Sequence, residues 1–338
     1  MATFLNYPFD PELFNYRWTQ ETDPTKTAII DSGAVVSDAT IASLISTGSD
    51  YYTLPIYDVL GGTPDNYDGQ TDITADTTTG KSQSGIVFGR AHGWTERQFV
   101  RDYNSGADPM SQIISQVAKF WRKYDQKTVL NLLEACFKAG AANQEFAKHV
   151  INIASASNTV TDDNRVGETT LGDACQKAVG DNKDIFTLAF MHSAVAQRYA
   201  DLKLLEYAKY TDANGIERPL NIGYVNGLTV VIDDGVPTTA ASSSAAATYT
   251  TYVLGAGVIR TADAPVTLPS EVSRDPAKNG GQNTLYTRRR KTFHVNGFSY
   301  TKPSGYAGSP TDAQLTDSKN WSLVANPKSL PLVKIVSN

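Results

Sequence analysis

The sequence predicts an α+β fold in which a long β-hairpin precedes one very long helix and strands dominate the last third of the chain. Strand and turn signals in residues 50–107 surround a polar segment, residues 108–139 keep one helical apolar period, and strand patterns recur from Tyr249 onward. The chain has 338 residues, of which 41% are hydrophobic and 19% charged. It is therefore long enough to bury a sizeable core and too rich in aromatic residues for a disordered chain.

The first 49 residues are expected to form an arm. Aromatic residues and prolines alternate in FLNYPFDPELFNYRW without a period that could build a core, so this segment is expected to lie on another surface. A short helix is predicted to begin at Ser37 or Asp38, which can cap it, with an apolar face formed by Ile41, Leu44 and Ile45.

Residues 50–107 are predicted to form a long β-hairpin. The stretch YYTLPIYDVL suits an edge strand because it contains a proline, and IVFGRAHGW (86–94) is expected to be the returning strand. The polar segment 61–85 between them is long for a loop inside a compact domain, and such loops usually have a function. The tip is acidic, because no Lys or Arg interrupts Asp58, Asp65, Asp68, Asp72 and Asp76.

Residues 108–139 give the clearest helix prediction. Asp108 can cap the N-terminus, Pro109 suits the first helical position, and Gly140 suits the end. At ~1.5 Å per residue the helix would run ~48 Å. A compact chain of this length has a radius of gyration of only ~20 Å, so the helix would cross almost the whole subunit. Trp121 lies on its apolar stripe and is expected to be a buried anchor.

Helix and strand signals alternate between residues 141 and 248. Helices are predicted at 170–180 and 192–210, and strands at 184–191 and within 222–234, where Asn226 and Gly227 favour a tight turn. Small residues dominate 237–248, a composition typical of a loop.

A basic cluster, Arg288 to Lys291, lies in a predicted C-terminal strand. Side chains alternate along a strand, so either Arg288 and Arg290 or Arg289 and Lys291 would share one face. This alternation weakens the interpretation as a nucleic-acid site. Contact with carboxylates, such as the acidic hairpin of a neighbouring subunit, is at least as well supported.

The charge is unevenly distributed. Residues 1–107 contain 6 Lys/Arg and 14 Asp/Glu, whereas the remaining 231 residues contain 24 and 21, which together give the net charge of −5. A chain that grips DNA through counterion release would normally be basic. The asymmetry is instead compatible with self-complementary packing between subunits, or with an acidic surface that only aids solubility.

The sequence offers no constellation for catalysis, a metal or a cofactor. The four histidines have no metal-ligand spacing, and Cys136 and Cys175 are predicted to be reduced thiols. The carboxylate pairs 162–163 and 233–234 lie in predicted loops without companion groups. No apolar run approaches the ~20 residues that span a bilayer, and no secretory signal is visible at the start.

The order of these elements resembles that of the major capsid (coat) proteins of tailed bacteriophages. SGAVVSDATIASLISTGSDYYTLPIYDVLGG looks like their arm-to-hairpin region, and DPMSQIISQVAKFWRKYDQ looks like the opening of their spine helix. RRRKTFHVNGFSYT and the closing NWSLVANPKSLPLVKIV look like their C-terminal strands. The resemblance covers most of the chain.

The resemblance implies the Johnson fold of tailed-phage capsids. It would divide the chain into an N-terminal arm (1–49), an E-loop hairpin (50–107), the spine helix of a P-domain (108–144), an A-domain (145–255), and P-domain strands with the C-terminal strand (256–338). E-loops usually cover a P-domain, so the acidic tip of one subunit would lie on Arg288, Arg289, Arg290 and Lys291 of another.

The implied function is structural. Copies of the chain would assemble through pentamers and hexamers into an icosahedral head around double-stranded DNA, which the shell contacts non-specifically. Assembly would take place in the bacterial host cytoplasm with portal and scaffolding proteins as further partners, without a cofactor or a membrane. The alternatives are a tail-tube or other virion protein, a shell-forming nanocompartment protein, and an enzyme that uses isolated carboxylates. The spine helix argues against a tail tube, and the lack of a catalytic constellation argues against an enzyme.

Overall fold

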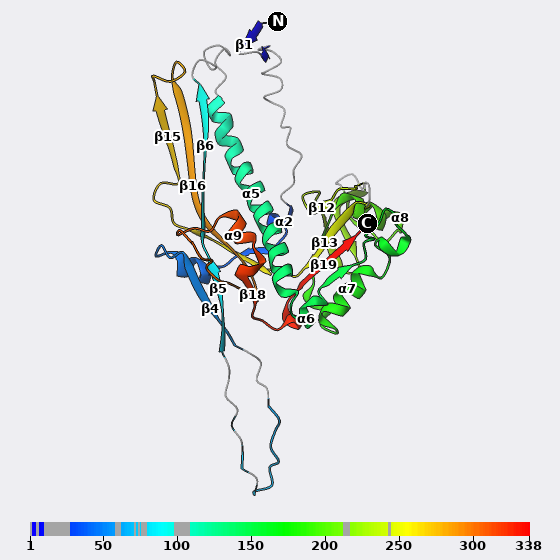
Figure 1. Cartoon of the computed structure of the whole chain (residues 1–338). Helices are drawn as coiled ribbons and strands as arrows, with labels where there is room; N and C mark the ends of the chain where they lie inside the picture. Colours follow the sequence, from blue (N-terminus) through cyan, green and yellow to red (C-terminus); the bar gives the residue numbers. More distant parts are fainter. Residues whose placement is uncertain are drawn as a thin grey trace.

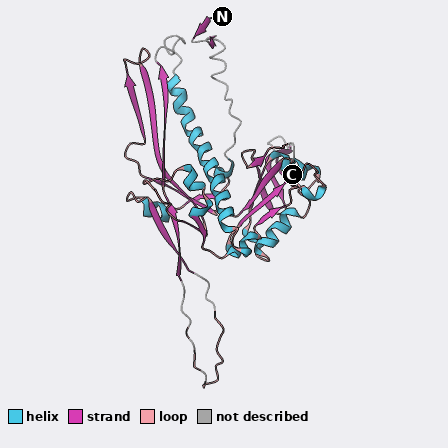
Figure 2. Cartoon of the chain, in the orientation of Figure 1, coloured by secondary structure: helices cyan, strands magenta, loops and turns pink. Residues whose placement is uncertain are grey.

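The computed structural model describes residues 2–4, 7–9, 28–57, 62–70, 72–73, 75, 80–97, 109–211, 217–242 and 245–338. A long helix, α5 (Pro109–Gly140), runs between an elongated sheet on one side and a sheet covered by helices on the other (Figure 1). A β-hairpin extends away from both bodies at the opposite end from the start of α5 (Figure 2). No helix among the described residues is long and apolar enough to cross a membrane.

The helix-covered body contains an eight-stranded sheet. Its order is β7-β19-β13-β8-β11-β10-β9, with β12 paired to β13. The strands are β7 (Val150–Asn152), β8 (Leu188–Met191), β9 (Glu206–Thr211), β10 (Glu217–Val225), β11 (Leu228–Ile232), β12 (Thr238–Thr239), β13 (Thr248–Leu254) and β19 (Leu332–Ser337). The helices of this body are α6 (Gln144–Ala147), α7 (Thr170–Val179) and α8 (Ser193–Asp201), with 3₁₀ turns at Asp162–Asn164 and Lys183–Ile185.

The two faces of this sheet belong to two different cores, as strand alternation requires. In β13, Tyr252 and Leu254 pack in the same core as the buried residues of α5, whereas Val253 packs in the core of α7 and α8. Tyr252 also donates a hydrogen bond to Glu134 of α5 at 2.8 Å, and Lys334 of β19 pairs with the same carboxylate at 2.5 Å. The sheet is therefore held between α5 on one face and α7 and α8 on the other.

The second body is a five-stranded sheet beside α5. It has the order β15-β16-β14-β3, with β6 on the free side of β16. Its strands are β3 (Val35–Ser37), β6 (Phe88–Arg97), β14 (Ile259–Ala264), β15 (Ser270–Asp275) and β16 (Gln282–Val295). Smaller elements are β1 (Ala2–Phe4), β2 (Tyr7–Phe9), α2 (Ala28–Asp31), α3 (Ala39–Ile45), β17 (Phe298–Tyr300), α9 (Asp312–Thr316), β18 (Trp321–Leu323), and 3₁₀ turns at Ser318–Asn320 and Pro327–Ser329.

The predicted long helix is confirmed, with one correction to its buried face. Among its described side chains, the buried apolar stripe begins at Val129 and includes Leu132, Leu133 and Cys136. Trp121 lies further towards the N-terminus and is only partly buried, so the prediction of a buried anchor there is wrong. The helix ends at Gly140, which is its last helical residue and does not take the left-handed φ of a C′ glycine. Glycine is needed there because a Cβ would lie 2.3 Å from the ring of Phe146 in α6.

Three further local predictions meet different outcomes. The helix after Asp38 is confirmed, since the Asp38 carboxylate accepts from the Thr40 and Ile41 amides, but Leu44 on its expected apolar face is exposed. The Asn226-Gly227 turn joins β10 and β11 as predicted, with φ values of 52° and 79°. The helix predicted to run to residue 210 ends instead at Asp201, because Lys203 takes a left-handed φ of 59° and residues 206–211 form β9.

The hairpin is confirmed, but its returning strand differs from the prediction. β4 (Tyr51–Tyr57) pairs antiparallel with β5 (Gly80–Ile86), so the polar stretch KSQSG is part of the returning strand. Thr53 and Ser84, directly opposite each other, form a hydrogen bond of 3.0 Å, which shows how a polar sequence is used in this pair. The predicted strand 86–94 is instead largely β6, which pairs with β16 along its length.

The structure also places two segments that local patterns left open. The C-terminal strand β19 joins the eight-stranded sheet between β13 and β7, away from the other C-terminal strands. The described part of the small-residue segment 237–248 includes β12, which pairs with the beginning of β13.

Candidate interaction surfaces

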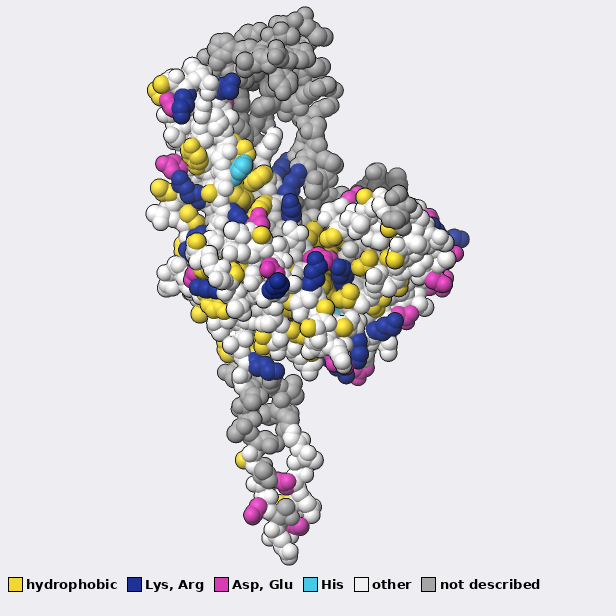
Figure 3. All heavy atoms as spheres, in the orientation of Figure 1, with side chains coloured by type: hydrophobic (Ala, Val, Ile, Leu, Met, Phe, Trp, Pro, Cys, Tyr) yellow, Lys and Arg dark blue, Asp and Glu magenta, His cyan; other side chains and the backbone are white. Residues whose placement is uncertain are grey.

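The hairpin tip presents acidic and apolar side chains to solvent (Figure 3). Asp65, Asp68 and Asp72 are exposed, whereas Asp58 and Asp76 lie outside the described residues. The Asp68 carboxylate accepts from the Gln70 amide at 2.8 Å, which shapes the chain locally. Tyr67 and Ile73 stand among these carboxylates with 93% and 78% of their surface exposed. The sequence signal that identifies them is simple, since they are isolated large apolar residues in a polar segment.

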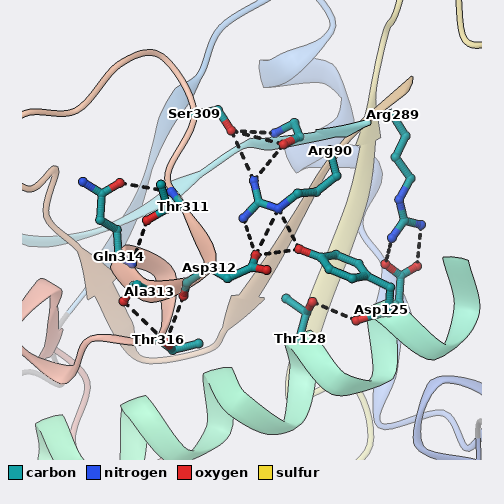
Figure 4. A network of polar contacts seen from close by, with 12 residues as sticks. Arg90, Asp125, Thr128, Arg289, Ser309, Thr311, Asp312, Ala313, Gln314 and Thr316 are labelled. Carbon is teal, nitrogen blue, oxygen red and sulfur yellow. Dashed lines mark hydrogen bonds and ion pairs between the residues drawn. The ribbon is translucent and has the colours of Figure 1, made fainter. Parts of the chain in front are cut away.

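The basic cluster is divided between the two faces of β16, as strand alternation predicted. Arg289 and Lys291 face α5 and share the carboxylate of Asp125, which is buried. Arg289 forms a two-pronged contact, with Nη1 donating to Asp125 Oδ2 at 2.9 Å and Nη2 donating to Oδ1 (Figure 4). The Lys291 Nζ atom lies 3.3 Å from Asp125 Oδ2 and 3.6 Å from Asp263 Oδ1. This half of the cluster is therefore occupied within its own chain.

Aromatic rings of α5 complete the Arg289 site. The guanidinium carbon lies 4.2 Å from the centre of the Trp121 ring and 5.6 Å from that of Tyr124. A guanidinium over an indole face is the most favourable cation–π arrangement. Trp121 thus serves as a platform for a cation, which explains why it is only partly buried. Asp125 could have been found from the sequence, because it lies four residues after Trp121 on the apolar stripe, where a carboxylate needs a cation.

Arg288 and Arg290 lie on the opposite face of β16. Arg288 pairs with Glu271 of β15 at 3.0 Å. Arg290 donates to the backbone carbonyls of Gly48 and Ser49 at 3.4 and 3.2 Å. Of the two pairs that alternation allowed to face a partner, Arg288 and Arg290 are the pair that does not contact α5.

Most of this opposite face is open to solvent. Register and alternation place one set of residues from three adjacent strands on it. We call its exposed members the open face: Ala91, Gly93 and Thr95 of β6, Tyr286 and Arg288 of β16, and Glu271 and Ser273 of β15. Thr284 of β16 lies on the same face but is buried, and its hydroxyl is hydrogen-bonded to that of Thr95 at 3.2 Å. The Tyr286 ring lies against Gly93, where a Cβ would come within 3.0 Å of it, and keeps 42% of its surface exposed. The open face thus combines small side chains with one half-exposed aromatic ring and an ion pair.

A second polar network joins β6, α5 and α9. Arg90 Nη2 donates to Asp312 Oδ1 at 2.6 Å, and its Nε donates to the Tyr124 hydroxyl at 2.6 Å (Figure 4). That hydroxyl donates in turn to Asp312 Oδ1 at 2.6 Å. Burial would raise the pKa of Asp312, but the hydrogen bonds from Tyr124 and Arg90 outweigh it and lower the pKa below 3.8. Together with the Asp125 site, this network fixes the long sheet to α5.

The cysteines and paired carboxylates that could in principle serve in catalysis are instead buried or held by partners within the fold. Cys136 and Cys175 are buried free thiols whose pKa burial raises, to about 11 for Cys175. Asp162 pairs with Arg198 at 3.1 Å. Asp233 accepts from Gln126 of α5 at 2.6 Å. Among the described residues, no group of three or more His, Cys, Asp or Glu side chains could hold a metal ion.

Two of the four histidines are buried, His149 in the turn before β7 and His294 within β16. His149 bonds the Leu332 carbonyl through Nδ1 at 2.6 Å, and burial lowers its pKa. His294 lies in β16 opposite Arg260, with neither ring nitrogen hydrogen-bonded within the described part of the chain. Burial, and then the charge of Arg260, lower the pKa of His294 to about 4. Both rings are therefore neutral core residues at neutral pH.

The amino-acid sequence and the fold are similar to those of known proteins. The family model described as "Major capsid protein 13-like" (Gp13-like) matches residues 63–331. The major capsid protein of Bacillus phage SPP1 is 26% identical over 326 residues, which cover 96% of this chain and 94% of that protein.

Solved capsid structures share the fold at low sequence identity. The capsid asymmetric unit of cyanophage Pam1 has a TM-score of 0.58 at 10% identity, over 94% of this chain and 93% of that chain. The capsid of Ralstonia phage GP4 has a TM-score of 0.56 at 10% identity, over 94% and 95% of the two chains. At this identity the structural likeness supports the fold, while the family match supports the biological role.

Proposed function

The chain belongs to the Gp13-like family of major capsid proteins, and from this premise we propose that its copies assemble through pentamers and hexamers into an icosahedral shell around double-stranded DNA. As a member of this family, the protein forms phage heads, is part of the virion, and acts as a structural protein without enzymatic activity. The tail-tube and enzyme alternatives are thereby set aside. The match over residues 63–331, from the hairpin tip to the C-terminal strands, carries this conclusion.

The proposed division into domains follows the two sheets. The spine helix α5 and the five-stranded sheet would form the P-domain, with the projecting hairpin as its E-loop. The eight-stranded sheet with α7 and α8 would form the A-domain, which then includes the C-terminal strand β19. Portal and scaffolding proteins, and non-specific contact with the packaged DNA, belong to the proposal as further partners of the shell.

Electron microscopy of the purified, assembled protein tests this function. We expect closed shells, and heads isolated from infected cells should contain nuclease-resistant double-stranded DNA. Protease should cut unassembled subunits first between residues 61 and 79, ahead of the paired strand β5, and assembly should protect those bonds. Open tubes or small particles would contradict head formation, and shells that always lack DNA would favour a nanocompartment.

The hairpin of one copy is proposed to lie on the P-domain of another, with charges that set its orientation. Asp65, Asp68 and Asp72 at the tip would face Arg288 and Arg290. Asp58 and Asp76 remain candidates from the sequence. Arg289 and Lys291 are the weaker candidates, because both already contact Asp125.

Reversing one charge should weaken assembly modestly. Arg288→Glu is expected to raise the critical assembly concentration a few-fold at low salt, since an exposed ion pair contributes only ~0–1 kcal/mol. Asp68→Lys or Asp72→Lys in the same chain should partly restore assembly. Both effects should fade as salt rises, because the Debye length falls to ~8 Å at physiological ionic strength. Unchanged assembly of Arg288→Glu at low salt would exclude this contact and favour DNA as the partner of the exposed cations.

A further inference from the structure

We propose that Tyr67 and Ile73 at the hairpin tip are apolar anchors that pack on the open face around Tyr286 in a second copy of the chain. The proposal rests on the proposed placement of the hairpin on a neighbouring subunit and adds the side chains that hold it there. It assigns the main attraction to apolar contact and leaves orientation to the charges.

The tip presents its apolar side chains where its own chain has no surface to receive them. Tyr67 and Ile73 are 93% and 78% exposed in a segment that is otherwise polar. Figure 1 shows the tip at the far end of the molecule from the upper part of β6, β15 and β16. Covering large exposed apolar side chains with another surface lowers the free energy of the system, because it removes them from water. A second copy can supply that surface, whereas the same chain cannot.

The open face is shaped to receive such side chains. Ala91, Gly93, Thr95 and Ser273 are small, so an incoming side chain can approach the strands closely. Tyr286 lies along this surface because Gly93 leaves room for its ring. The nearby Leu268 is 57% exposed, and its carbonyl accepts from Arg288 Nη1 at 3.4 Å. Aromatic rings prefer offset or edge-to-face contact, which a half-exposed Tyr286 allows Tyr67 to make.

Charge alone would hold the hairpin weakly. Arg288 already pairs with Glu271, and Arg290 already bonds two backbone carbonyls, so any new carboxylate must compete with these partners. Exposed ion pairs of this kind contribute little to affinity. The charges can still set the orientation, because acidic residues flank the two apolar residues on the tip, whereas the open face has Arg288 on one side of Tyr286 and Glu271 opposite it, so that only an approach from the Arg288 side is favourable. Such complementarity favours one orientation and one register.

Assembly thresholds separate the two contributions. Tyr67→Ser and Ile73→Ser should each raise the critical assembly concentration about tenfold or more, which is typical of an interface hot spot. The increase should persist in high salt, unlike that of Arg288→Glu. Gly93→Val should act similarly from the receiving side by displacing the Tyr286 ring. The matched control is Tyr224→Ser, since Tyr224 is 45% exposed on β10 of the other body, and this variant should assemble like the wild type.

Photocrosslinking locates the contact without removing an aromatic anchor. Tyr67→benzoylphenylalanine, irradiated in assembled heads, should give inter-subunit products that map to β6 or β16 near Gly93 and Tyr286. The same probe at position 224 should not react there. Heads with a protease-protected hairpin, but without this product and with unshifted thresholds, would overturn the anchor proposal and leave the capsid function intact. Failure of the wild-type chain to form closed shells would instead count against the capsid function itself.

Discussion

Replacing Asp125 with asparagine should lower the free energy of unfolding by roughly 3–5 kcal/mol, the usual cost of removing one partner from a buried ion pair. Asp125 is 6% exposed, and the side chains of Arg289 and Lys291 that share it are only 21% and 17% exposed. Without the carboxylate, two largely desolvated cations would face each other beside α5. Urea unfolding of the unassembled subunit measures the effect.

A matched control distinguishes burial from mere loss of charge. Asp31→Asn removes a carboxylate of α2 that lies 2.9 Å from Arg122, which is on α5 like Asp125. In this pair the side chains of Asp31 and Arg122 are 50% and 58% exposed. Its cost should stay below about 1 kcal/mol. If the free energy of unfolding falls by the same amount in both variants, burial does not strengthen the ion pairs of Asp125.

The ion pairs of Asp125 with Arg289 and Lys291, which we call the clamp, should also affect assembly. Successive side chains of β16 point to opposite faces, so fixing one set fixes the other. As Arg289 and Lys291 are held against α5, Tyr286 and Arg288 must point to the open face. Loosening the clamp should therefore disorder the receiving surface as well as the core. The Asp125→Asn variant is expected to assemble poorly even at temperatures where the subunit remains folded.

Local patterns predicted those elements whose signal lies within one segment. The capping residues and the apolar period of α5 are neighbours in sequence, so its bounds could be read directly. Alternation in β16 likewise divided the basic cluster into two pairs. It could not say which pair faces α5, because Asp125 comes from a helix more than 160 residues earlier in the chain.

The incorrect predictions share a tertiary cause. KSQSG reads as loop, yet it forms β5 because Thr53 and Ser84 pair across the hairpin and the Ser84 amide bonds Ser299. The stretch 192–210 keeps a helical period, but the turn at Lys203 and the pairing of β9 with β10 end the helix early. β19 joins β13 across almost eighty residues of sequence, a partner that no local pattern specifies. Tyr67 and Ile73 were not predicted as contact residues, because the acidic charge of the segment was the only signal for a partner there.

Acid should weaken the five-stranded sheet through His294. This side chain is fully buried in β16. Arg260 of β14 lies directly opposite His294, and Asp38 lies close enough to affect the pKa of His294. The ring centres of His294 and of Tyr52 in β4 are 6.1 Å apart. Burial, then Arg260, lower its pKa from 6.5 to about 4, while Asp38 opposes the shift only weakly. Protonation would place a cation beside Arg260 at the base of the hairpin, in a fully buried site.

The sign of the pH dependence follows from the lowered pKa. Between pH 6.5 and about 4 the unfolded chain binds a proton at His294 that the folded chain does not, so the stability present above pH 6.5 is lost as the pH falls. At 1.36 kcal/mol per pKa unit, this shift amounts to roughly 3 kcal/mol.

The variant His294→Gln tests this dependence, because it has no titrating ring at this position. Between pH 7 and 4 its free energy of unfolding should fall by roughly 3 kcal/mol less than that of the wild type. Carboxylates with lowered pKa values, such as Asp38, Asp50 and Asp312, lose stability in both proteins, so the comparison isolates the histidine. Denaturant unfolding of the two subunits across this range measures it, and parallel curves would show that His294 does not carry the acid sensitivity.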